Sequence, residues 1–197
     1  MKMDYNSILN QASDLLSNFK VKNPRLDSEL LLSNSLSKSR ESLLLNLNKK
    51  ISNKKYLKFL NFLEERKKKK PIAYILGFKD FWRTRFVINN SVLIPRPETE
   101  LIVEESLNYL SNNNSKQIID IGTGSGCIII SILKESLKSK GVAIDISKNA
   151  IKIAKINAKL QQVDDRIKFI NSNVDKYNYG KYDLVVSNPP YIKKIRI

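Results

Sequence analysis

The feature that most constrains the fold is a regular alternation of strand-like and helix-like segments in the second half of the chain. Short runs rich in isoleucine and valine alternate with longer amphipathic stretches, at residues 117–121, 127–137, 141–145, 148–160, 167–170 and 182–187. Strands separated by helices form parallel sheets with helices packed against them. The alternation therefore predicts an α/β domain with a doubly wound parallel sheet covered on both faces.

The first half of the chain has a different pattern. Apolar residues at helical spacing predict helices, the second opened by Pro24 and the third capped by Ser39, over residues 5–19, 25–36, 39–47 and 53–70. Aromatic and β-branched residues around Asn89 and Asn90 then predict a β-hairpin within 78–94, and 101–110 predicts a further helix. The domains expected are a helical bundle at 1–72, a hairpin linker at 73–92 and the α/β domain at 93–197.

The composition removes several classes of chemistry. The chain of 197 residues contains no histidine, which excludes imidazole-based triads and histidine-ligated metals, and no metal site is expected. Cys127 is the only cysteine and has no internal partner, as is usual in a reducing compartment. The N-terminus has no apolar signal-peptide core, and no run is long enough to cross a bilayer. A cytoplasmic protein is expected.

The formal charge of +16 leaves two interpretations open. A strongly basic chain suits an anionic partner such as RNA, whereas surface lysines also serve simply to keep a protein hydrated. The densest cluster, "ERKKKKP" at 65–71, follows a predicted helix, where cations suit the helix dipole. No aromatic residues interleave it as a base-stacking platform needs, so dedicated nucleic-acid binding is not expected.

A glycine loop follows the first strand of the alternating region. In "DIGTGSGC", Gly122, Gly124 and Gly126 alternate with Thr123 and Ser125, and they allow a tight turn that brings the backbone close to a ligand. The spacing is G-x-G-x-G rather than the G-x-G-x-x-G of dinucleotide folds. On its own the loop is also compatible with a turn that binds nothing.

The next strand ends in Asp145, where a carboxylate can accept hydrogen bonds from both hydroxyls of a ribose. The alternative is a helix cap, a role that Ser147 can fill instead. Ligands of α/β sheets bind at the carboxyl ends of the strands, so the loop and this acid are expected to share one pocket. The pocket suits a ligand that contains adenosine, and both NAD and S-adenosylmethionine remain possible at this point.

The segment "SNPPY" after the last strand distinguishes between them. The prolines restrict the backbone at Asn188, whose side-chain oxygen is therefore expected to be presented rigidly, beside the Pro189 carbonyl and the Tyr191 ring. Two acceptors and a flat ring suit a planar NH2 group. Methyl transfer to a delocalised nitrogen needs that orientation and no strong base, whereas hydride transfer does not need it. The alternative is a turn without a chemical role.

These motifs also carry a family resemblance. "IPRPETE", "DIGTGSG", "AIDIS" followed by "NA", and "SNPPYI" stand in the order and spacing of the HemK/PrmC family, which the chain resembles up to about Ile192. The helical N-terminus and "PIAYILGFKDFW" resemble that family too. "IPRPETE" makes the match specific, because amino-methyltransferases at large lack it. The resemblance implies a Rossmann-like S-adenosylmethionine-dependent methyltransferase fold behind an N-terminal helical bundle.

The resemblance also implies an activity and a set of site residues. Members methylate the N(5) amide nitrogen of the glutamine in the Gly-Gly-Gln motif of peptide chain release factors, a step of translation termination, and their N-terminal bundle helps to recognise the release factor. The cofactor would be bound by Gly122, Thr123, Gly124, Ser125, Gly126, Asp145 and Asn188. Catalysis would fall to Asn188, Pro189 and Tyr191, and glutamine binding to Asn188, Pro189, Pro190 and Tyr191. The expected protein is a monomer whose partner is the release factor.

Two positions depart from the family pattern. The family has an aspartate and a bulky residue near the adenine, where this chain has Asn173 and Val174, so weaker cofactor binding is expected. The family sheet also continues past "NPPY", where this chain has "KKIRI". The chain is accordingly expected to be a C-terminally truncated member with an incomplete fold, in which 182–187 becomes an exposed, aggregation-prone edge.

Two other functions stay open from the sequence. One is methylation of an exocyclic amine such as adenine N6 in RNA or DNA, which uses the same geometry for holding an amine. The other is an inactive fragment that only binds partners through its basic helical bundle. Labelling of a release factor separates the first from the leading hypothesis, and cofactor binding tests the second.

Overall fold

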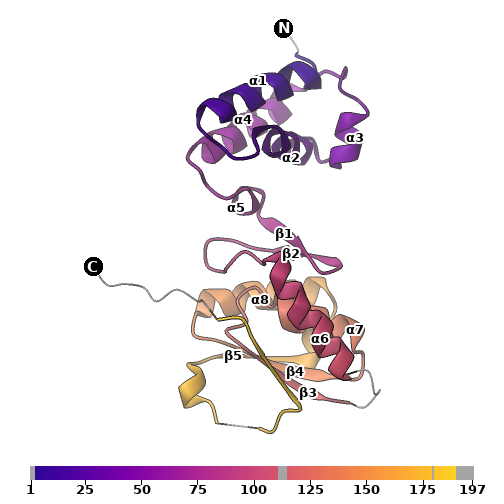
Figure 1. Cartoon of the computed structure of the whole chain (residues 1–197), viewed down its shortest axis with the longest axis vertical. Helices are drawn as coiled ribbons and strands as arrows, with labels where there is room; N and C mark the ends of the chain where they lie inside the picture. The colour runs from indigo at the N-terminus through magenta and orange to yellow at the C-terminus, as the bar shows by residue number, and fades with distance from the viewer. Residues whose placement is uncertain (1–2, 111–114, 179, 190–197) are drawn as a thin grey trace, which may run out of the picture. The chain divides into compact units, whose positions relative to one another are not determined.

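The computed structural model describes residues 3–110, 115–178 and 180–189, and the chain divides into two compact units, Met1–Gly77 and Phe78–Ile197. The first unit is helical, with α1 (Tyr5–Asn18), α2 (Pro24–Leu36), α3 (Arg40–Leu44), α4 (Asn53–Lys67) and α5 (Ile72–Leu76) (Figure 1). The four helices predicted for this region are confirmed, and α5 was not predicted. Along the chain the division falls after Gly77, and the predicted domain limits at residues 72 and 92 stay predictions.

Capping and apolar packing explain the first unit. The side chain of Asp4 accepts a hydrogen bond from the Ser7 backbone N–H at the start of α1, and the side chain of Ser39 accepts one from Ser42 at the start of α3. Such caps satisfy backbone donors that the first turn of a helix leaves without partners. Between the helices lies an apolar core that includes Leu9, Leu31 and Phe59.

The lysine cluster is largely neutralised within the first unit. The Arg66 guanidinium contacts the buried Asp27 carboxylate at 2.7 Å. Further along, the Lys67 ammonium contacts the Glu64 carboxylate, and those of Lys68 and Lys70 contact Glu65. Each exposed pair contributes little stability, but the pairing lowers the local charge. The cluster therefore offers less unpaired positive charge than its sequence implies.

The second unit opens with a hairpin of β1 (Phe78–Phe81) and β2 (Thr84–Val87). The hairpin predicted within 78–94 is confirmed, but the predicted turn at Asn89 and Asn90 is wrong, because the strands are joined at Trp82 and Arg83. Trp82 adopts a φ of 53°, and its backbone N–H donates to the Glu100 carboxylate at 2.7 Å. The Asn89 side chain instead accepts from the Ser91 backbone N–H in a local turn.

A parallel sheet follows, as predicted. Its described strands are β3 (Gln117–Ile121), β4 (Lys140–Asp145), β5 (Ile167–Asn171) and β6 (Leu184–Ser187), in the order β5-β4-β3-β6. The helices of this unit are α6 (Glu100–Leu110), α7 (Cys127–Glu135) and α8 (Lys148–Leu160), and short 3-10 turns lie at Pro97–Thr99, Asp164–Arg166 and Val174–Lys176. The chain reverses its direction across the sheet between β3 and β6, which creates a switch point of the kind where α/β folds bind ligands. The Rossmann-like fold class is thereby confirmed.

The two faces of the sheet are covered differently. One face packs through Ile118 and Ala143 into a core with α6, α7, α8 and the hairpin. The opposite face carries Ile119, Val142 and Ile144, and its described partners include Tyr177 and Tyr182, from the segment between β5 and β6, rather than helix residues. The two tyrosine hydroxyls share a hydrogen bond of 2.7 Å. Among the described residues, the second face is thus covered by an irregular segment, whereas the doubly wound sheet expected from the sequence is covered by helices on both faces.

Strand β6 forms the edge of the sheet within the described residues. It pairs only with β3, and the Val185 side chain is 59% exposed. An exposed apolar edge at this strand is what the sequence predicts, and aggregation through it stays a prediction. Across the described part of the chain, the helices are too short or too polar to serve as membrane spans.

Candidate functional site

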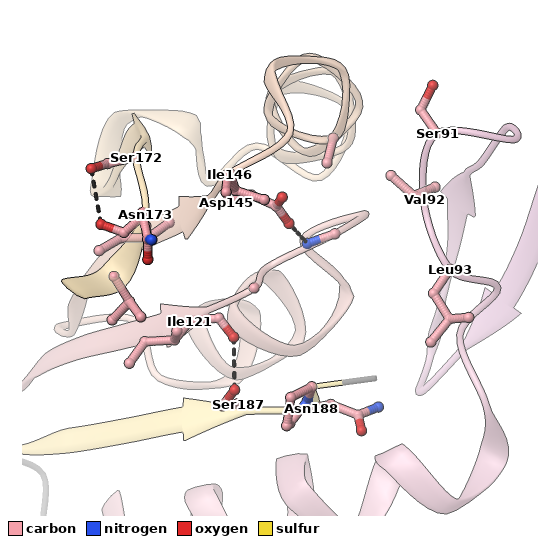
Figure 2. Close-up of a pocket in the computed structure, with 16 residues that line it drawn as sticks. Ser91, Val92, Leu93, Ile121, Asp145, Ile146, Ser172, Asn173, Ser187 and Asn188 are labelled. Carbon is pink, nitrogen blue, oxygen red and sulfur yellow. Dashed lines mark hydrogen bonds between the residues drawn. The ribbon is translucent and has the colours of Figure 1, made fainter. Parts of the chain in front are cut away.

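A cavity of about 430 Å³ lies at the carboxyl ends of β3, β4 and β6 (Figure 2). The predicted site residues that line it are Gly122, Gly124, Asp145, Asn188 and Pro189. Asn173 and Val174 line it as well, together with Ser91, Val92, Leu93, Ile121, Ile144, Ile146, Ala150, Ser172 and Ser187. Pro190 and Tyr191 lie outside the described residues. Three separate sequence motifs therefore meet at one cavity.

The glycine loop is folded back against the end of β4. The backbone N–H groups of Gly122 and Thr123 both donate to the Ile144 carbonyl, at 2.8 and 2.9 Å. Gly124 has a φ of 57°, and its N–H donates to the Asp145 carboxylate at 2.9 Å. This left-handed conformation disfavours residues with a Cβ, so glycine suits the position. The loop thus presents Gly122 and Gly124 to the cavity.

Gly126 has a packing role rather than a place on the cavity wall. It precedes α7 with a φ of 80°, and a Cβ there would lie 2.7 Å from Ile130 Cδ1 and 3.2 Å from Ala154 Cβ. The absence of a side chain therefore lets α7 and α8 approach each other closely. The close packing of α7 and α8 at Gly126 supports the end of the glycine loop.

The other two loop residues point their side chains into the protein. Thr123 and Ser125 are buried, and neither lines the cavity. The Thr123 hydroxyl donates to the Asp120 carboxylate at 2.7 Å, whereas the Ser125 carbonyl accepts from the Asn157 side chain at 2.9 Å. A role for Thr123 and Ser125 in ligand binding would fall to their backbone atoms.

Asp120 lies beneath the loop and is fully buried. The pKa of its carboxyl is raised to about 7, mainly because burial disfavours the charged form; the hydrogen bond from Thr123 lowers the pKa, and the nearby negative charge of Asp145 raises it. One carboxylate oxygen of Asp120 has no hydrogen-bond partner among the described residues. A neutral carboxyl group at this position is therefore favoured up to near pH 7.

Asp145 organises the loop from the end of β4. One of its carboxylate oxygens accepts from the Gly124 N–H, and the other accepts from the Ser147 N–H at 2.8 Å. Ser147, and not Asp145, caps α8, because its hydroxyl accepts from the Ala150 N–H. A carboxylate has about four acceptor positions, so two remain for a ligand. Asp145 can hold the loop and bind hydroxyl groups at the same time.

Asn188 follows β6 at the rim of the cavity (Figure 2). Its side-chain Nδ2 donates to the Thr99 hydroxyl oxygen at 2.9 Å. Just before it, the Ser187 hydroxyl donates to the Ile121 carbonyl at 2.8 Å, which ties the end of β6 to β3. Asn188 is therefore held from two elements that lie far apart in the sequence.

Sequence reasoning missed three features of the site. Ser91, Val92 and Leu93 line the cavity, whereas the sequence pattern assigns them to the hairpin. Asn157 gave no signal, because an asparagine within an amphipathic helix is unremarkable in a sequence. Thr99 stands in "IPRPETE", a motif that the sequence analysis singled out without assigning it a structural role.

Comparisons with known proteins agree with the division into two units. Residues 7–77 match the family model described as PrmC N-terminal domain, and residues 99–196 match the one described as Methyltransferase small domain. A release factor glutamine methyltransferase from Buchnera aphidicola subsp. Schizaphis graminum is 38% identical over 190 residues, which cover 96% of this chain and 68% of the relative.

Other similar proteins are longer or more distant. A bifunctional methyltransferase from Rickettsia typhi is 39% identical over 211 residues, covering 98% of this chain and 41% of the relative. The chain thus spans about two fifths of the length of the first curated relatives. Among solved structures, an RNA methyltransferase from Salinibacter ruber in complex with S-adenosyl-L-homocysteine is 24% identical, covers 48% of this chain and 60% of its own, and has a TM-score of 0.42.

Proposed function

We propose that this chain, which belongs to the HemK/PrmC family, uses S-adenosylmethionine to methylate the glutamine amide nitrogen in the Gly-Gly-Gln motif of a peptide chain release factor. The proposal rests mainly on one observation. Asn188 and Pro189 line the same cavity as the glycine loop and Asp145. A group that can orient an amide therefore stands beside a place suited to an adenosine cofactor. We place this reaction in the cytoplasm, where translation terminates, and propose that the protein acts as a monomer.

The residues present fit the cofactor. The cavity of about 430 Å³ falls within the range usual for small-molecule sites, and a Cβ added at Gly122 would meet no atom within 4 Å. Asp145 would accept hydrogen bonds from the ribose hydroxyls, and Ile146 and Val174 would supply apolar surface for the adenine. When bound, S-adenosylmethionine supplies a methyl group on a positively charged sulfur.

Asn173 lines the part of the cavity where the adenine is expected to bind. Its side-chain oxygen accepts from the Asp175 backbone N–H at 3.1 Å and so caps the turn that follows β5. One acceptor position of this oxygen is therefore occupied, and an amide carries less negative charge than a carboxylate. Weaker binding than with an aspartate at this position remains our expectation.

The substrate amide would be oriented by Asn188 and Pro189. The Asn188 side-chain oxygen and the Pro189 carbonyl would accept the two hydrogens of the glutamine NH2, which fixes the plane of the amide. The nitrogen can then direct electron density towards the methyl group, and positioning of this kind can supply a large part of a rate acceleration. The nitrogen loses a proton to water, so no strong base is required. Packing of Tyr191 on the amide face stays a prediction, because Tyr191 lies outside the described residues.

Transfer of a labelled methyl group tests the proposal directly. The 197-residue chain is incubated with methyl-labelled S-adenosylmethionine and a release factor, with the Buchnera relative assayed in parallel as a positive control. Label is expected in the tryptic peptide that contains Gly-Gly-Gln, and none is expected when that glutamine is replaced by alanine. A chain that binds the cofactor but labels no release factor would contradict the proposal. Label transferred to RNA or DNA in a competition assay would favour the adenine alternative.

Replacement of Asp145 by alanine is expected to weaken S-adenosylmethionine binding about 10- to 100-fold. The variant loses a charged acceptor for the ribose hydroxyls, and a net loss of about 1.5 to 3 kcal/mol corresponds to this factor. It also releases the Gly124 N–H and thus loosens the loop. Isothermal titration calorimetry measures the dissociation constant.

The matched control for this prediction is Ser147→Ala. It removes the cap of α8 and is expected to lower stability by about 1 kcal/mol, with cofactor affinity changed less than about threefold. Equal affinities of the Asp145→Ala variant and the unmodified chain would leave Asp145 with a structural role alone.

A further inference from the structure

The conformation of the Asn188 side chain needs an explanation that its neighbouring prolines do not supply. A proline restricts the backbone torsions of the residue before it, but not that residue's side-chain torsions. The terminal torsion of an asparagine is broad, with two orientations of similar energy. The sequence argument for a rigidly presented amide is therefore incomplete, and another contact must select the orientation.

Thr99 makes such a contact. It lies in the 3-10 turn Pro97–Thr99, is 6% exposed, and accepts a hydrogen bond from Asn188 Nδ2 at 2.9 Å through its hydroxyl oxygen. Threonine is branched at Cβ and has few side-chain conformations, so the acceptor is nearly fixed in space. Because the carboxamide is planar, holding the nitrogen also fixes the direction of the oxygen.

The element that carries Thr99 is itself anchored. The Thr99 backbone N–H donates to the Arg96 carbonyl at 3.0 Å, which closes the turn. Next to it, the Glu100 carboxylate accepts from the Trp82 backbone N–H in the hairpin. Val103, one turn further along α6, is fully buried in the core. The acceptor therefore belongs to a braced structure and not to a free loop.

We propose that Thr99 is a positioning residue for the methyl transfer, and that its hydroxyl holds the Asn188 carboxamide in the orientation that receives the substrate amide. The inference rests on the proposed function. It assigns a physical role to "IPRPETE", in which Thr99 orients the amide-binding residue while Glu100 anchors the turn to the hairpin. Thr99 acts through Asn188 and needs no contact with the reacting atoms.

The test compares Thr99→Val, Thr99→Ser and the control Ser106→Ala. The valine variant removes the hydroxyl with little change in shape, and the serine variant restores it. Ser106 is a buried hydroxyl on α6 that donates to the Ile102 carbonyl and does not line the cavity. We expect Thr99→Val to lower kcat about 10- to 100-fold with the cofactor dissociation constant changed less than twofold. Thr99→Ser is expected to recover kcat to within about threefold, and Ser106→Ala to have no effect.

A double-mutant cycle separates positioning from a general loss of stability. If Thr99 acts through Asn188, Thr99→Val has no further effect on single-turnover rates in an Asn188→Ala background. Independent effects that multiply would overturn the inference. So would a normal kcat in Thr99→Val, or a loss of stability in urea that accounts for its whole defect.

A spectroscopic measurement keeps the inference testable when no methyl transfer is detected. The side-chain NH2 signals of Asn188 in a heteronuclear correlation spectrum are assigned by their disappearance in Asn188→Ala. We expect Thr99→Val to shift them, Thr99→Ser to restore them and Ser106→Ala to leave them unchanged. Unshifted signals would overturn the inference, whereas absent transfer with shifted signals would count against the proposed function alone.

Discussion

Replacement of Asn188 by alanine is expected to lower kcat for glutamine methylation about 100- to 1000-fold, with a much smaller change in affinity for S-adenosylmethionine. Removing one group that orients or stabilises the reacting atoms commonly has an effect of this size. The effect falls on kcat because the lost oxygen would orient the substrate amide, whereas Asp145 and the glycine loop would hold most of the cofactor. Single-turnover transfer and calorimetry measure the two quantities separately.

Two further variants sharpen this prediction. Asn188→Gln keeps the carboxamide but displaces it by one methylene group, so its kcat is expected to be nearly as low as that of the alanine variant. Asn149, an exposed asparagine in the first turn of α8, provides the matched control, and its alanine variant should behave like the unmodified chain. Normal turnover in Asn188→Ala would remove the basis of the proposed mechanism.

Replacement of Asn157 by leucine is expected to lower the free energy of unfolding of the second unit by about 3 kcal/mol. Asn157 is completely buried on α8, and its Nδ2 donates to the carbonyls of Val87 and Ser125 at 2.9 Å. Its oxygen accepts from the Val87 N–H at 2.7 Å. Leucine would leave these three backbone groups without their partner, and each such loss is costly in the interior.

Trp82 provides the measurement, because it is the only tryptophan and lies in the hairpin that Asn157 anchors. Its fluorescence during urea unfolding reports the midpoint and slope for this unit. Gln161→Ala is the matched control, since Gln161 also joins the C-terminal end of α8 to the hairpin, by donating to the Arg85 carbonyl, but at the surface. We expect that control to cost less than about 1 kcal/mol. A loss of unfolding free energy in Asn157→Leu as small as that in Gln161→Ala would contradict the prediction. If the leucine variant does not fold, the same measurement is made on Asn157→Asp.

The sequence predicts those parts of the fold that depend on local patterns. The periodicity of apolar residues located the strands and most helices, because burial of one face imposes that period. The hairpin turn was misplaced because Asn89 and Asn90 gave a local turn signal, whereas the actual turn depends on Glu100, which lies 18 residues from Trp82. Strand order and the irregular cover over one face likewise depend on contacts between distant residues.

The candidate site likewise has features that the sequence predicts and features that depend on long-range contacts. The sequence alone predicts that one site contains Gly122, Gly124, Asp145 and Asn188, because the carboxyl ends of parallel strands meet at one edge of a sheet. The contact of Thr99 with Asn188 could not be predicted from the sequence, since the two residues lie 89 positions apart. Nor does spacing alone reveal that Thr123 and Ser125 turn inwards. Local chemistry indicates which residues reach the site, and long-range contacts determine how each is held.

The buried carboxyl of Asp120 makes the folded chain a proton acceptor. In the unfolded chain this group ionises near its ordinary pKa of 3.8, whereas in the folded chain the pKa is about 7. Folding in that interval takes up a proton, so the contribution of Asp120 to stability is greatest in acid and declines as the pH rises towards 7. Above this range the ionised carboxylate is a buried negative charge that accepts a hydrogen bond from the Thr123 hydroxyl and lies near the negative charge of Asp145. Protonation of Asp120 and folding of the chain are thus thermodynamically linked through this one carboxyl group.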